Sequence, residues 1–165
     1  MALRVHAIGN RGSWADLSPC GRYRYALARR WGSGPGMAFV LLNPSRADAE
    51  ASDPTLARCV ARARALGFGA VRVVNLFAWR SPDPAALRAA PDPVGPETDA
   101  ALLRTAAWAR VVLCGWGAGG VLSGRDAAVR RLLGRRRLWH LGLTAGGQPR
   151  HPLYVRNEVV PQLWR

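Results

Sequence analysis

The segment MAFVLLNPSRADAEASD, residues 37–53, contains the clearest boundary between a strand and a loop in this chain. Its first residues, 37–42, are apolar, and a short apolar run that ends at a turn is typical of a buried strand. Pro44 fixes its own φ and favours extended backbone at Asn43, so the Asn43 side chain is expected at the strand's carboxyl end. Because ligands of open α/β sheets bind at that end, the segment predicts a central strand and a binding site beside it.

The residues on either side of this strand predict further elements. Residues 1–21 are rich in glycine and turn signals, which predicts an irregular N-terminal segment. Residues 22–31 alternate weakly between long polar and apolar side chains, which favours an antiparallel edge strand whose arginines face water. Asp53 and Pro54 predict a helix start, with Asp53 as the N-cap, and Gly67 ends that helix. Strands are also expected at residues 70–74, 111–114 and 137–143, helices at 97–109 and 125–133, and a helical turn at 84–89.

The order of these elements predicts a single domain over residues 1–165, with an α/β core at residues 22–165. At 165 residues the chain is long enough for one substantial hydrophobic core. Strands that alternate with helices favour parallel pairing, because a crossover helix returns the chain to the same end of the sheet. The expected fold is therefore α/β, with three α/β/α layers and a mainly parallel central sheet.

The charge of the chain is strongly positive. There are 24 basic residues, all of them arginine, against 10 acidic residues, which gives a net charge of +14. A GC-rich genome explains the choice of arginine over lysine but not the surplus of basic residues. Since guanidinium groups bind phosphates through paired donors, we expect a nucleic acid, DNA above all, as the partner. A merely solvated basic surface is the alternative.

Other features of the sequence exclude several classes of protein. Cys20, Cys59 and Cys114 are far apart and form no C-x-x-C pair, so neither a disulfide framework nor a metal site is expected. No apolar run approaches the ~18 residues of a spanning helix, and the N-terminus lacks the apolar centre of a signal peptide. We therefore expect a cytoplasmic protein with no membrane partner, no metal and no cofactor.

Polar residues follow several of the predicted strands. Asn43, Asn75 and His151 each occupy such a position, and we expect them to converge at one edge of the sheet. Each also has an ordinary alternative, because Asn is a common turn residue and a His before Pro is often a surface or capping group. Asp48 and Asp53 are acidic residues beside Asn43. Helix capping explains the presence of Asp53 but not that of Asp48. Asp48 is therefore a candidate for orienting a water or binding a sugar hydroxyl.

Several residues are candidates for binding phosphate. Ser45 either donates to a phosphate or begins a turn. Gly115 and Gly117 belong to a G-x-G-x-x-G pattern after a strand, but no acidic residue ends the following strand, so we reject NAD binding. A cradle of backbone N–H groups for an anion remains possible there, with Arg150 as a further phosphate ligand. The arginines near the predicted last helix either face phosphate or are merely solvated; they are Arg125, Arg130, Arg131, Arg135, Arg136 and Arg137.

Aromatic residues occur in the predicted loops beside these candidates, at Phe77, Trp79, Trp116 and Tyr154. One interpretation is that they cover the edge of the core. The other is that they stack on a base, an interaction of about 1–3 kcal/mol per base.

Four segments carry a resemblance to known families: LLNPSRADAEASDPT, VRVVNLFAWRSPDPAALRAAPDPVGPETDAAL, VVLCGWGAGG and LGLTAGGQPRHPLY. Together they resemble an uncharacterised bacterial family, the domain of unknown function 1643, over roughly residues 20–160. That family name implies no activity. More distantly, the order of elements resembles the uracil-DNA glycosylase superfamily, which implies a three-layer α/β/α fold.

The second resemblance implies roles for individual residues. Asn43-Pro44 is similar to a motif whose Asn or Asp positions the attacking water, and Asn75 to the Asn that reads the base. His151-Pro152 is similar to a motif whose His stabilises the departing base. No aromatic residue closely follows Pro44, so Phe77 or Trp79 would have to stack on the base. The chain also departs from the pattern at Leu153, where many members have Ser, and it lacks the iron–sulfur cysteines.

The resemblance implies a DNA glycosylase that cleaves the N-glycosidic bond of a damaged or modified, uracil-like base. A fixed amide at Asn43 would hold water against the sugar, and His151 would bind the anionic leaving group. Asn75 would read the pyrimidine edge, while arginines would hold the phosphates of the extruded nucleotide. Two alternatives are a nucleic-acid-binding module without chemistry and a hydrolase of free nucleotides or modified nucleosides.

Overall fold

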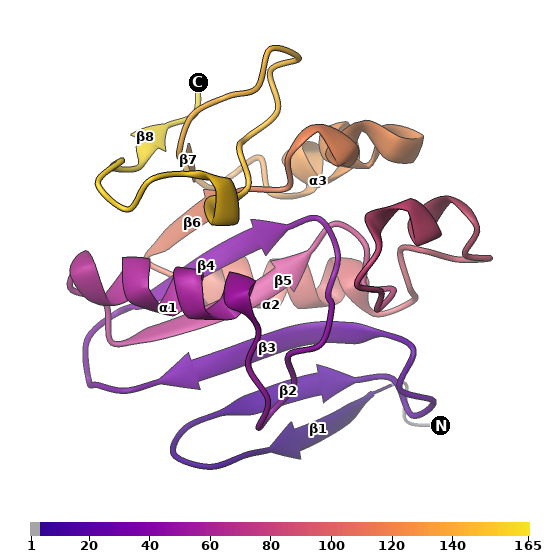
Figure 1. Ribbon diagram of the computed structural model, residues 1–165, viewed down its shortest axis with the longest axis horizontal. Coiled ribbons are helices and arrows are strands. Elements are labelled where there is room, and N and C mark those ends of the chain that lie inside the picture. Colours follow the sequence, from indigo (N-terminus) through magenta and orange to yellow (C-terminus); the bar gives the residue numbers. More distant parts are fainter. Residues whose placement is uncertain (1–3) are drawn as a thin grey trace.

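The structure, a computed structural model, describes residues 4–165 of the chain. Its strands form one mixed eight-stranded sheet in the order β1-β2-β3-β5-β4-β6-β7-β8 (Figure 1). Strands β4 and β5 are six residues long and largely buried, and they pair in parallel at the centre of the sheet. The strands are β1 (Val5–Ile8), β2 (Trp14–Leu17), β3 (Arg24–Arg30), β4 (Gly36–Leu41), β5 (Ala70–Asn75), β6 (Val111–Cys114), β7 (Leu138–His140) and β8 (Gln162–Leu163).

The prediction of a mainly parallel three-layer α/β/α fold is wrong. The pairs β1–β2, β2–β3, β3–β5 and β7–β8 are antiparallel, and only β4–β5, β4–β6 and β6–β7 are parallel. The strands that were not predicted are β1, β2 and β8, and each of them pairs antiparallel with its neighbour. Short connections join β1 to β2 and β2 to β3, and strands joined in this way pair antiparallel, so the N-terminal strands add an antiparallel half to the sheet.

The N-terminal segment is not irregular, as the sequence predicted, but contains the β1–β2 hairpin. Its turn is closed by the Gly9 N–H, which donates to the Ser13 carbonyl over 2.9 Å. The next strand, β3, was expected at an edge with its arginines in water. Instead β3 lies between β2 and β5, and Arg24 is only 4% exposed. Pairing on both sides removes β3 from solvent and carries this arginine into the interior.

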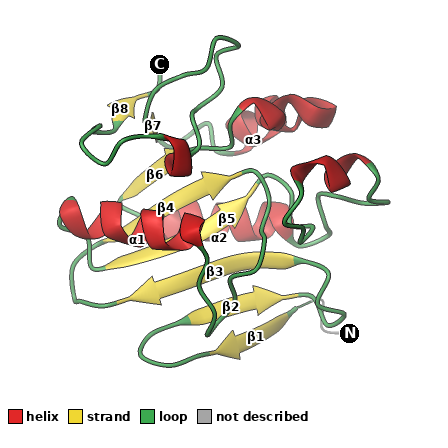
Figure 2. Ribbon diagram, viewed as in Figure 1, coloured by secondary structure: helices red, strands yellow, loops and turns green. Residues whose placement is uncertain are grey.

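The helices cover both faces of the sheet, as Figure 2 shows. One helix, α1 (Pro54–Ala65), packs on one face, where Leu56 and Ala63 join the core formed around Phe39. Two helices, α2 (Thr98–Trp108) and α3 (Arg125–Leu132), pack on the other face. Short 3₁₀ helices are η1 (Pro84–Arg88), η2 (Ala118–Gly124) and η3 (Pro152–Tyr154). No helix in residues 4–165 has both the length and the apolar character needed to cross a membrane.

The start of α1 follows the local prediction. Pro54 is its first residue, and the Asp53 carboxylate accepts a hydrogen bond of 2.8 Å from the Leu56 N–H. Asp53 thus satisfies one of the amide groups that the first turn of a helix leaves without a partner. The predicted helical turn at residues 84–89 is also present, as η1.

The register of the parallel strands determines where their loops leave the sheet. Leu41 of β4 lies opposite Asn75 of β5, and Val40 lies opposite Cys114 of β6. The chain segments that follow these strands therefore begin at the same edge. The Gly115 N–H, directly after β6, donates to the Val40 carbonyl over 2.8 Å and ties the start of the loop after β6 to strand β4.

Candidate functional site

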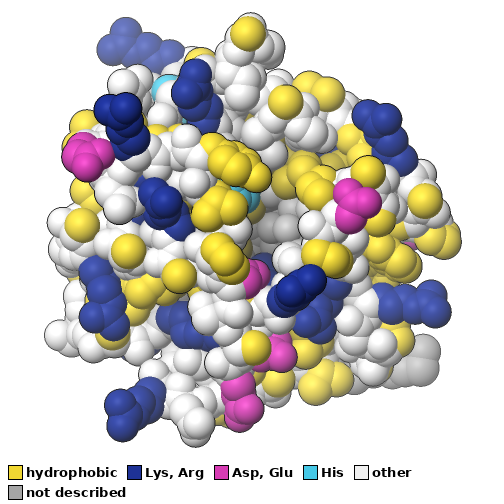
Figure 3. Space-filling model, viewed as in Figure 1, with side chains coloured by type: hydrophobic (Ala, Val, Ile, Leu, Met, Phe, Trp, Pro, Cys, Tyr) yellow, Lys and Arg dark blue, Asp and Glu magenta, His cyan; other side chains and the backbone are white. Residues whose placement is uncertain are grey.

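A pocket of about 670 Å³ opens at the edge where β4 and β6 end. Figure 3 shows it as a hollow near the middle of one face, with a histidine at its edge. Its volume lies within the range of roughly 300–1,000 Å³ that is usual for sites of small organic ligands. The lining residues are Leu42, Asn43, Ser45, Thr55, Ser81, Pro82, Pro84, Trp116, Gly117, Ala118, Gly119, Thr144, Arg150, His151, Leu153 and Tyr154.

Asn43 is held in one orientation by backbone carbonyls. Its Nδ2 group donates to the carbonyls of Pro44 and Ser81, each over 3.1 Å, and lies 3.4 Å from the carbonyl of Trp79. These contacts use the donors of the amide, and no group in residues 4–165 donates to its Oδ1 atom. Asn43 therefore offers the pocket a fixed hydrogen-bond acceptor.

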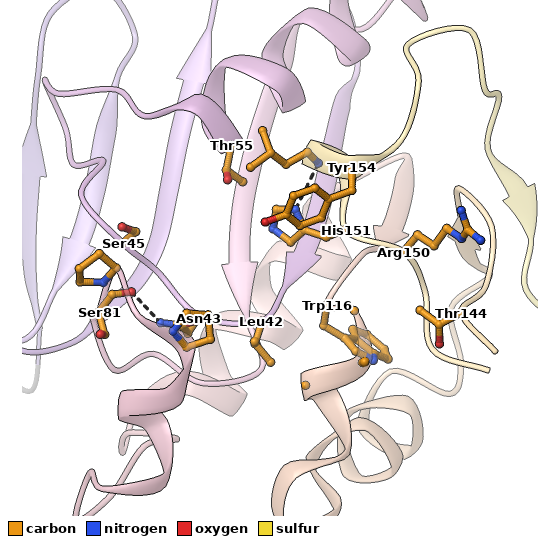
Figure 4. A pocket seen from close by; sticks show the side chains of 16 residues that line it. Leu42, Asn43, Ser45, Thr55, Ser81, Trp116, Thr144, Arg150, His151 and Tyr154 are labelled. Carbon is orange, nitrogen blue, oxygen red and sulfur yellow. Dashed lines mark hydrogen bonds between the residues drawn. The ribbon is translucent and has the colours of Figure 1, made fainter. Parts of the chain in front are cut away.

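His151 supplies the complementary group. Its Nδ1 atom accepts a hydrogen bond of 3.2 Å from the Leu153 N–H, which places the proton of the neutral ring on Nε2. Burial lowers the pKa of His151 below 6.5, and the negative charge of Asp53 opposes this shift only in part. The ring is therefore neutral at pH 7 and has an N–H donor to offer. Figure 4 shows His151 and Tyr154 between Asn43 on one side of the pocket and Arg150 on the other.

The loop after β6 positions the segment that carries His151. A Cβ atom on Gly115 would lie 2.8 Å from Cδ of Pro152, so only glycine allows this segment to approach β6 so closely. Gly117, with φ of 70°, donates its N–H to the Pro149 carbonyl over 2.7 Å. Both glycines therefore serve to hold residues 149–152 against the sheet.

A recess of about 40 Å³ lies beside the pocket and shares four of its lining residues. The shared residues are Asn43, Ser45, Thr55 and His151. The recess is also lined by Asn75, which is 3% exposed and whose Oδ1 atom has no hydrogen-bond partner in the described part of the chain. Since one water occupies ~30 Å³ of liquid, the recess has room for about one small polar group and not for a nucleobase. Asn43, Asn75 and His151 thus meet at one edge of the sheet, but the predicted single cleft wide enough for a nucleobase is not what they line together, because Asn75 lines the small recess and not the larger pocket.

Arg24 is a residue of this recess that was not predicted from the sequence. Its guanidinium group donates to the Ala47 carbonyl over 2.8 Å, and its buried Nε atom finds no hydrogen-bond partner among residues 4–165. Burial lowers the pKa of Arg24 to about 10, while the charge of Asp53 opposes the shift, so the group stays charged at pH 7. No sequence signal separates Arg24 from Arg22 or Arg29, because its burial follows from pairing with a strand more than forty residues later.

The two acidic residues of the loop after β4 have different roles. Asp48 accepts hydrogen bonds from the Glu50 and Ala51 N–H groups, over 2.9 and 2.7 Å, and these bonds lower its pKa. Asp48 shapes its own loop and does not line the pocket, where it was predicted to orient water. Asp53 lines the recess in addition to capping α1.

Of the four aromatic candidates, only two line the pocket, and these are not the two that the glycosylase resemblance assigned to the base. Phe77 is fully buried in the core and has no face to offer a ligand. Trp79 packs edge-on against Tyr23, with 5.6 Å between the ring centroids, and does not line the pocket. Trp116 and Tyr154 do line it, and Tyr154 is 82% exposed, with its ring centroid 5.8 Å from that of His151. Tyr154 is therefore the aromatic residue with surface free for stacking.

The predicted phosphate ligands are only partly brought together. Ser45, Gly117 and Arg150 line the pocket, whereas Gly115 does not. The N–H groups of Gly115 and Gly117 both donate to backbone carbonyls, so they are not free to form the predicted anion cradle. Among the arginines of the last helix, Arg125 is buried and pairs with Asp99 over 2.6 Å. No group of three or more His, Cys, Asp or Glu side chains in residues 4–165 is arranged to hold a metal ion.

The fold and the pocket define a mixed-sheet α/β protein with a candidate ligand site at the carboxyl ends of its parallel strands. A family model described as a protein of unknown function (DUF1643) matches residues 24–153, and the chain belongs to this family. Comparison with curated proteins gave no match, and neither did comparison with solved structures. The likeness to uracil-DNA glycosylases receives no support from these comparisons, so any function has to be argued from the site itself.

Proposed function

We propose that this protein hydrolyses the N-glycosidic bond of a uracil-like base in DNA. One observation carries the proposal: a fixed acceptor, Asn43 Oδ1, and a neutral donor, His151 Nε2–H, belong to the same nucleotide-sized pocket. Cleavage of this bond develops positive charge on the sugar and negative charge on the base. A hydrogen-bond acceptor on the sugar side and a donor on the base side are the groups that such a transition state requires.

In this mechanism Asn43 orients a water molecule towards the anomeric carbon of the sugar. The water oxygen forms the new bond to that carbon, and the electron pair of the broken C–N bond leaves with the base. The water releases its proton to solvent, because an amide is not a base. His151 donates a hydrogen bond to the oxygen on which the negative charge of the departing base gathers.

The recess behind Asn43 and His151 gives the base a polar contact. The Arg24 Nε–H group is a buried donor and Asn75 Oδ1 a buried acceptor, and neither has a hydrogen-bond partner within the residues that the structure describes. Leaving such groups unpaired costs about 1–3 kcal/mol each, which a ligand recovers by supplying the missing partners. We propose that one polar substituent of the base, or a water bound to it, enters this recess.

DNA as the substrate is supported by the charge of +14 and by the exposed ring of Tyr154 at the pocket. The charge attracts a polyanion, and the ring offers a stacking surface for an extruded base. A cytoplasmic location agrees with cysteines that are unpaired within residues 4–165, namely Cys20, Cys59 and Cys114.

The proposal is tested by incubating the protein with single-stranded and duplex oligonucleotides that carry uracil, hypoxanthine or other altered bases. Abasic sites are then scored by alkaline strand cleavage. The Asn43→Ala and His151→Asn variants should lose base release, and Asn in place of His151 retains an oxygen that can accept from the Leu153 N–H. An Asn157→Ala variant, altered at an exposed position outside the pocket, should remain active.

Each alternative function has its own result in the same experiment. Binding to every oligonucleotide without release of any base would replace the enzymatic proposal with a binding module. Release of a base from free nucleosides, with oligonucleotides left intact, would identify an enzyme of small substrates.

A further inference from the structure

A second hollow, of about 790 Å³, lies between α1 and the β2–β3 side of the sheet. Four arginines line it: Arg11, Arg29, Arg30 and Arg64. We call this hollow the arginine groove. Arginine side chains are numerous on the α1 side of the molecule, the face seen in Figure 3. The arginine groove and the pocket lie on opposite sides of the first turn of α1. Ser52 and Ala57 line the groove, whereas Thr55 lines the pocket.

The arginine groove carries positive charge that its own lining does not neutralise. Among residues 4–165, no Asp or Glu lines it. Arg29 donates to the carbonyls of Asp48 and Ala51, over 2.6 and 3.0 Å, and Arg30 donates to the Gly32 carbonyl over 2.7 Å. Carbonyl oxygens orient a guanidinium group but leave its charge intact. The carboxylates of Asp48 and Asp53 act on Arg29 from outside the lining.

The other two arginines of the groove, Arg11 and Arg64, are available to bind an anion. Arg11 is exposed and makes no ion pair within residues 4–165. Arg64 is exposed on α1, and its guanidinium carbon lies 4.8 Å from the ring centroid of Trp31. Trp31 is itself fixed, since its Nε1–H group donates to the Phe68 carbonyl over 3.0 Å. Because Arg64 covers this ring, the groove offers guanidinium donors and not an open stacking surface.

We propose that the arginine groove binds the phosphate groups of a nucleic-acid backbone. Several guanidinium groups around one hollow repel one another, and an anion bound between them relieves this repulsion while accepting their paired donors. A polymer is the occupant that we favour over a single phosphate, because the four arginines come from three segments of the chain, the β1–β2 loop, β3 and α1, and can contact several successive phosphates. This proposal does not require the pocket to be catalytic.

The test compares two double variants that remove the same amount of charge. Arg11→Asn with Arg64→Gln alters the groove, and Asn is chosen because Arg11 has φ of 52°, which Asn tolerates. Arg104→Gln with Arg110→Gln alters two exposed arginines outside the groove, one in α2, which packs on the opposite face of the sheet, and one just after that helix. Binding of a fluorescent single-stranded oligonucleotide of ordinary bases is measured by anisotropy over a series of salt concentrations. Thermal melts establish that both variants are folded.

The groove variant should bind about tenfold more weakly and show a smaller salt slope, by roughly 0.7 for each phosphate that the variant no longer neutralises. The α2 variant should bind within about twofold of the wild type. Equal weakening by both variants would assign binding to net charge and overturn the proposal, as would an absence of oligonucleotide binding. Inorganic tripolyphosphate is added as a competitor, to distinguish a nucleic-acid backbone from a small phosphate compound as the ligand of the groove. Binding of tripolyphosphate without binding of the oligonucleotide would overturn the assignment to a polymer.

Discussion

The pocket and the arginine groove lie on either side of the first turn of α1, yet they are built on different principles. The pocket holds neutral groups fixed by hydrogen bonds, with the Asn43 amide bound to backbone carbonyls and His151 kept neutral by burial. The groove holds charged groups near the surface, two of which, Arg11 and Arg64, are exposed. Fixed neutral dipoles suit the stabilisation of a transition state, whereas exposed surface charges suit attraction of a polyanion. We therefore expect chemistry in one hollow and electrostatic binding in the other.

The largest expected effect is on catalysis at the pocket. Asn43→Ala removes the fixed acceptor and should lower the rate of base release by about 100- to 1000-fold, the usual result of deleting one preorganised polar group. Binding of an oligonucleotide of ordinary bases should change little, since the groove is intact. Single-turnover rates and anisotropy measure the two properties separately. A variant that releases bases at the wild-type rate would remove Asn43 from the mechanism.

The next effect concerns Asp53, which lies where the two hollows approach each other. Asp53→Ala removes the N-cap of α1 and the carboxylate oxygen that accepts from the Ala47 N–H. The free energy of unfolding should fall by about 2 kcal/mol. Urea titration measures this loss. Asp53→Asn keeps an oxygen that can cap Leu56 but loses both the charge and the second oxygen, which accepts from the Ala47 N–H, so any loss in that variant combines this hydrogen bond with the attraction between Asp53 and the buried Arg24 guanidinium.

A smaller effect, on the binding of oligonucleotides, should distinguish the pocket from the arginine groove. Tyr154→Ala removes the exposed ring at the pocket, and the absence of a stacking interaction of ~1–3 kcal/mol should weaken binding about tenfold. This weakening should occur with an oligonucleotide that carries uracil and vanish with an abasic analogue, while Tyr154→Phe should bind normally. The groove variant should weaken binding of both oligonucleotides alike. Equal weakening of both by Tyr154→Ala would show that the ring contacts the backbone and not the base.

The smallest effect is a dependence of stability on pH. Burial puts the pKa of His151 in the folded protein below its unfolded value of 6.5, so the unfolded chain takes up a proton first as the pH falls. His151 should therefore cost no stability above pH 6.5 and destabilise the fold progressively below it. His151→Asn should reduce this pH dependence in urea titrations. His140, whose pKa burial also lowers, is present in both proteins and cancels from the difference.

The sequence predicted the elements that depend on neighbouring residues. Asp53 and Pro54 marked the start of α1, and the structure confirms both the cap and the first residue. The strand that ends before Asn43 was also predicted, because its apolar run and its proline are local signals. The direction of strand pairing was not predicted, because it depends on which distant segments meet. The β1–β2 hairpin was missed since its short strands lie among turn residues.

The candidate site was predicted to a similar extent. Asn43 and His151 reach the pocket because each lies in a segment that follows the central strands or packs against them. Phe77 was assigned to a base because it was expected in a loop, but its ring packs into the core. Arg24 was missed, because a charged residue in a strand is expected at the surface unless its neighbours on both sides are known.

The sequence by itself determined the central strand, the helix starts, the positive charge and the identity of the polar groups at the strand ends. These properties follow from backbone preferences and from composition, which act over a few residues or over the chain as a whole. Only the tertiary structure decided that half of the sheet is antiparallel, that Arg24 is buried behind the pocket, and that four arginines surround a second hollow. Each of these outcomes depends on contacts between segments distant in sequence, and the free energy of such contacts is set by burial and not by local residue type.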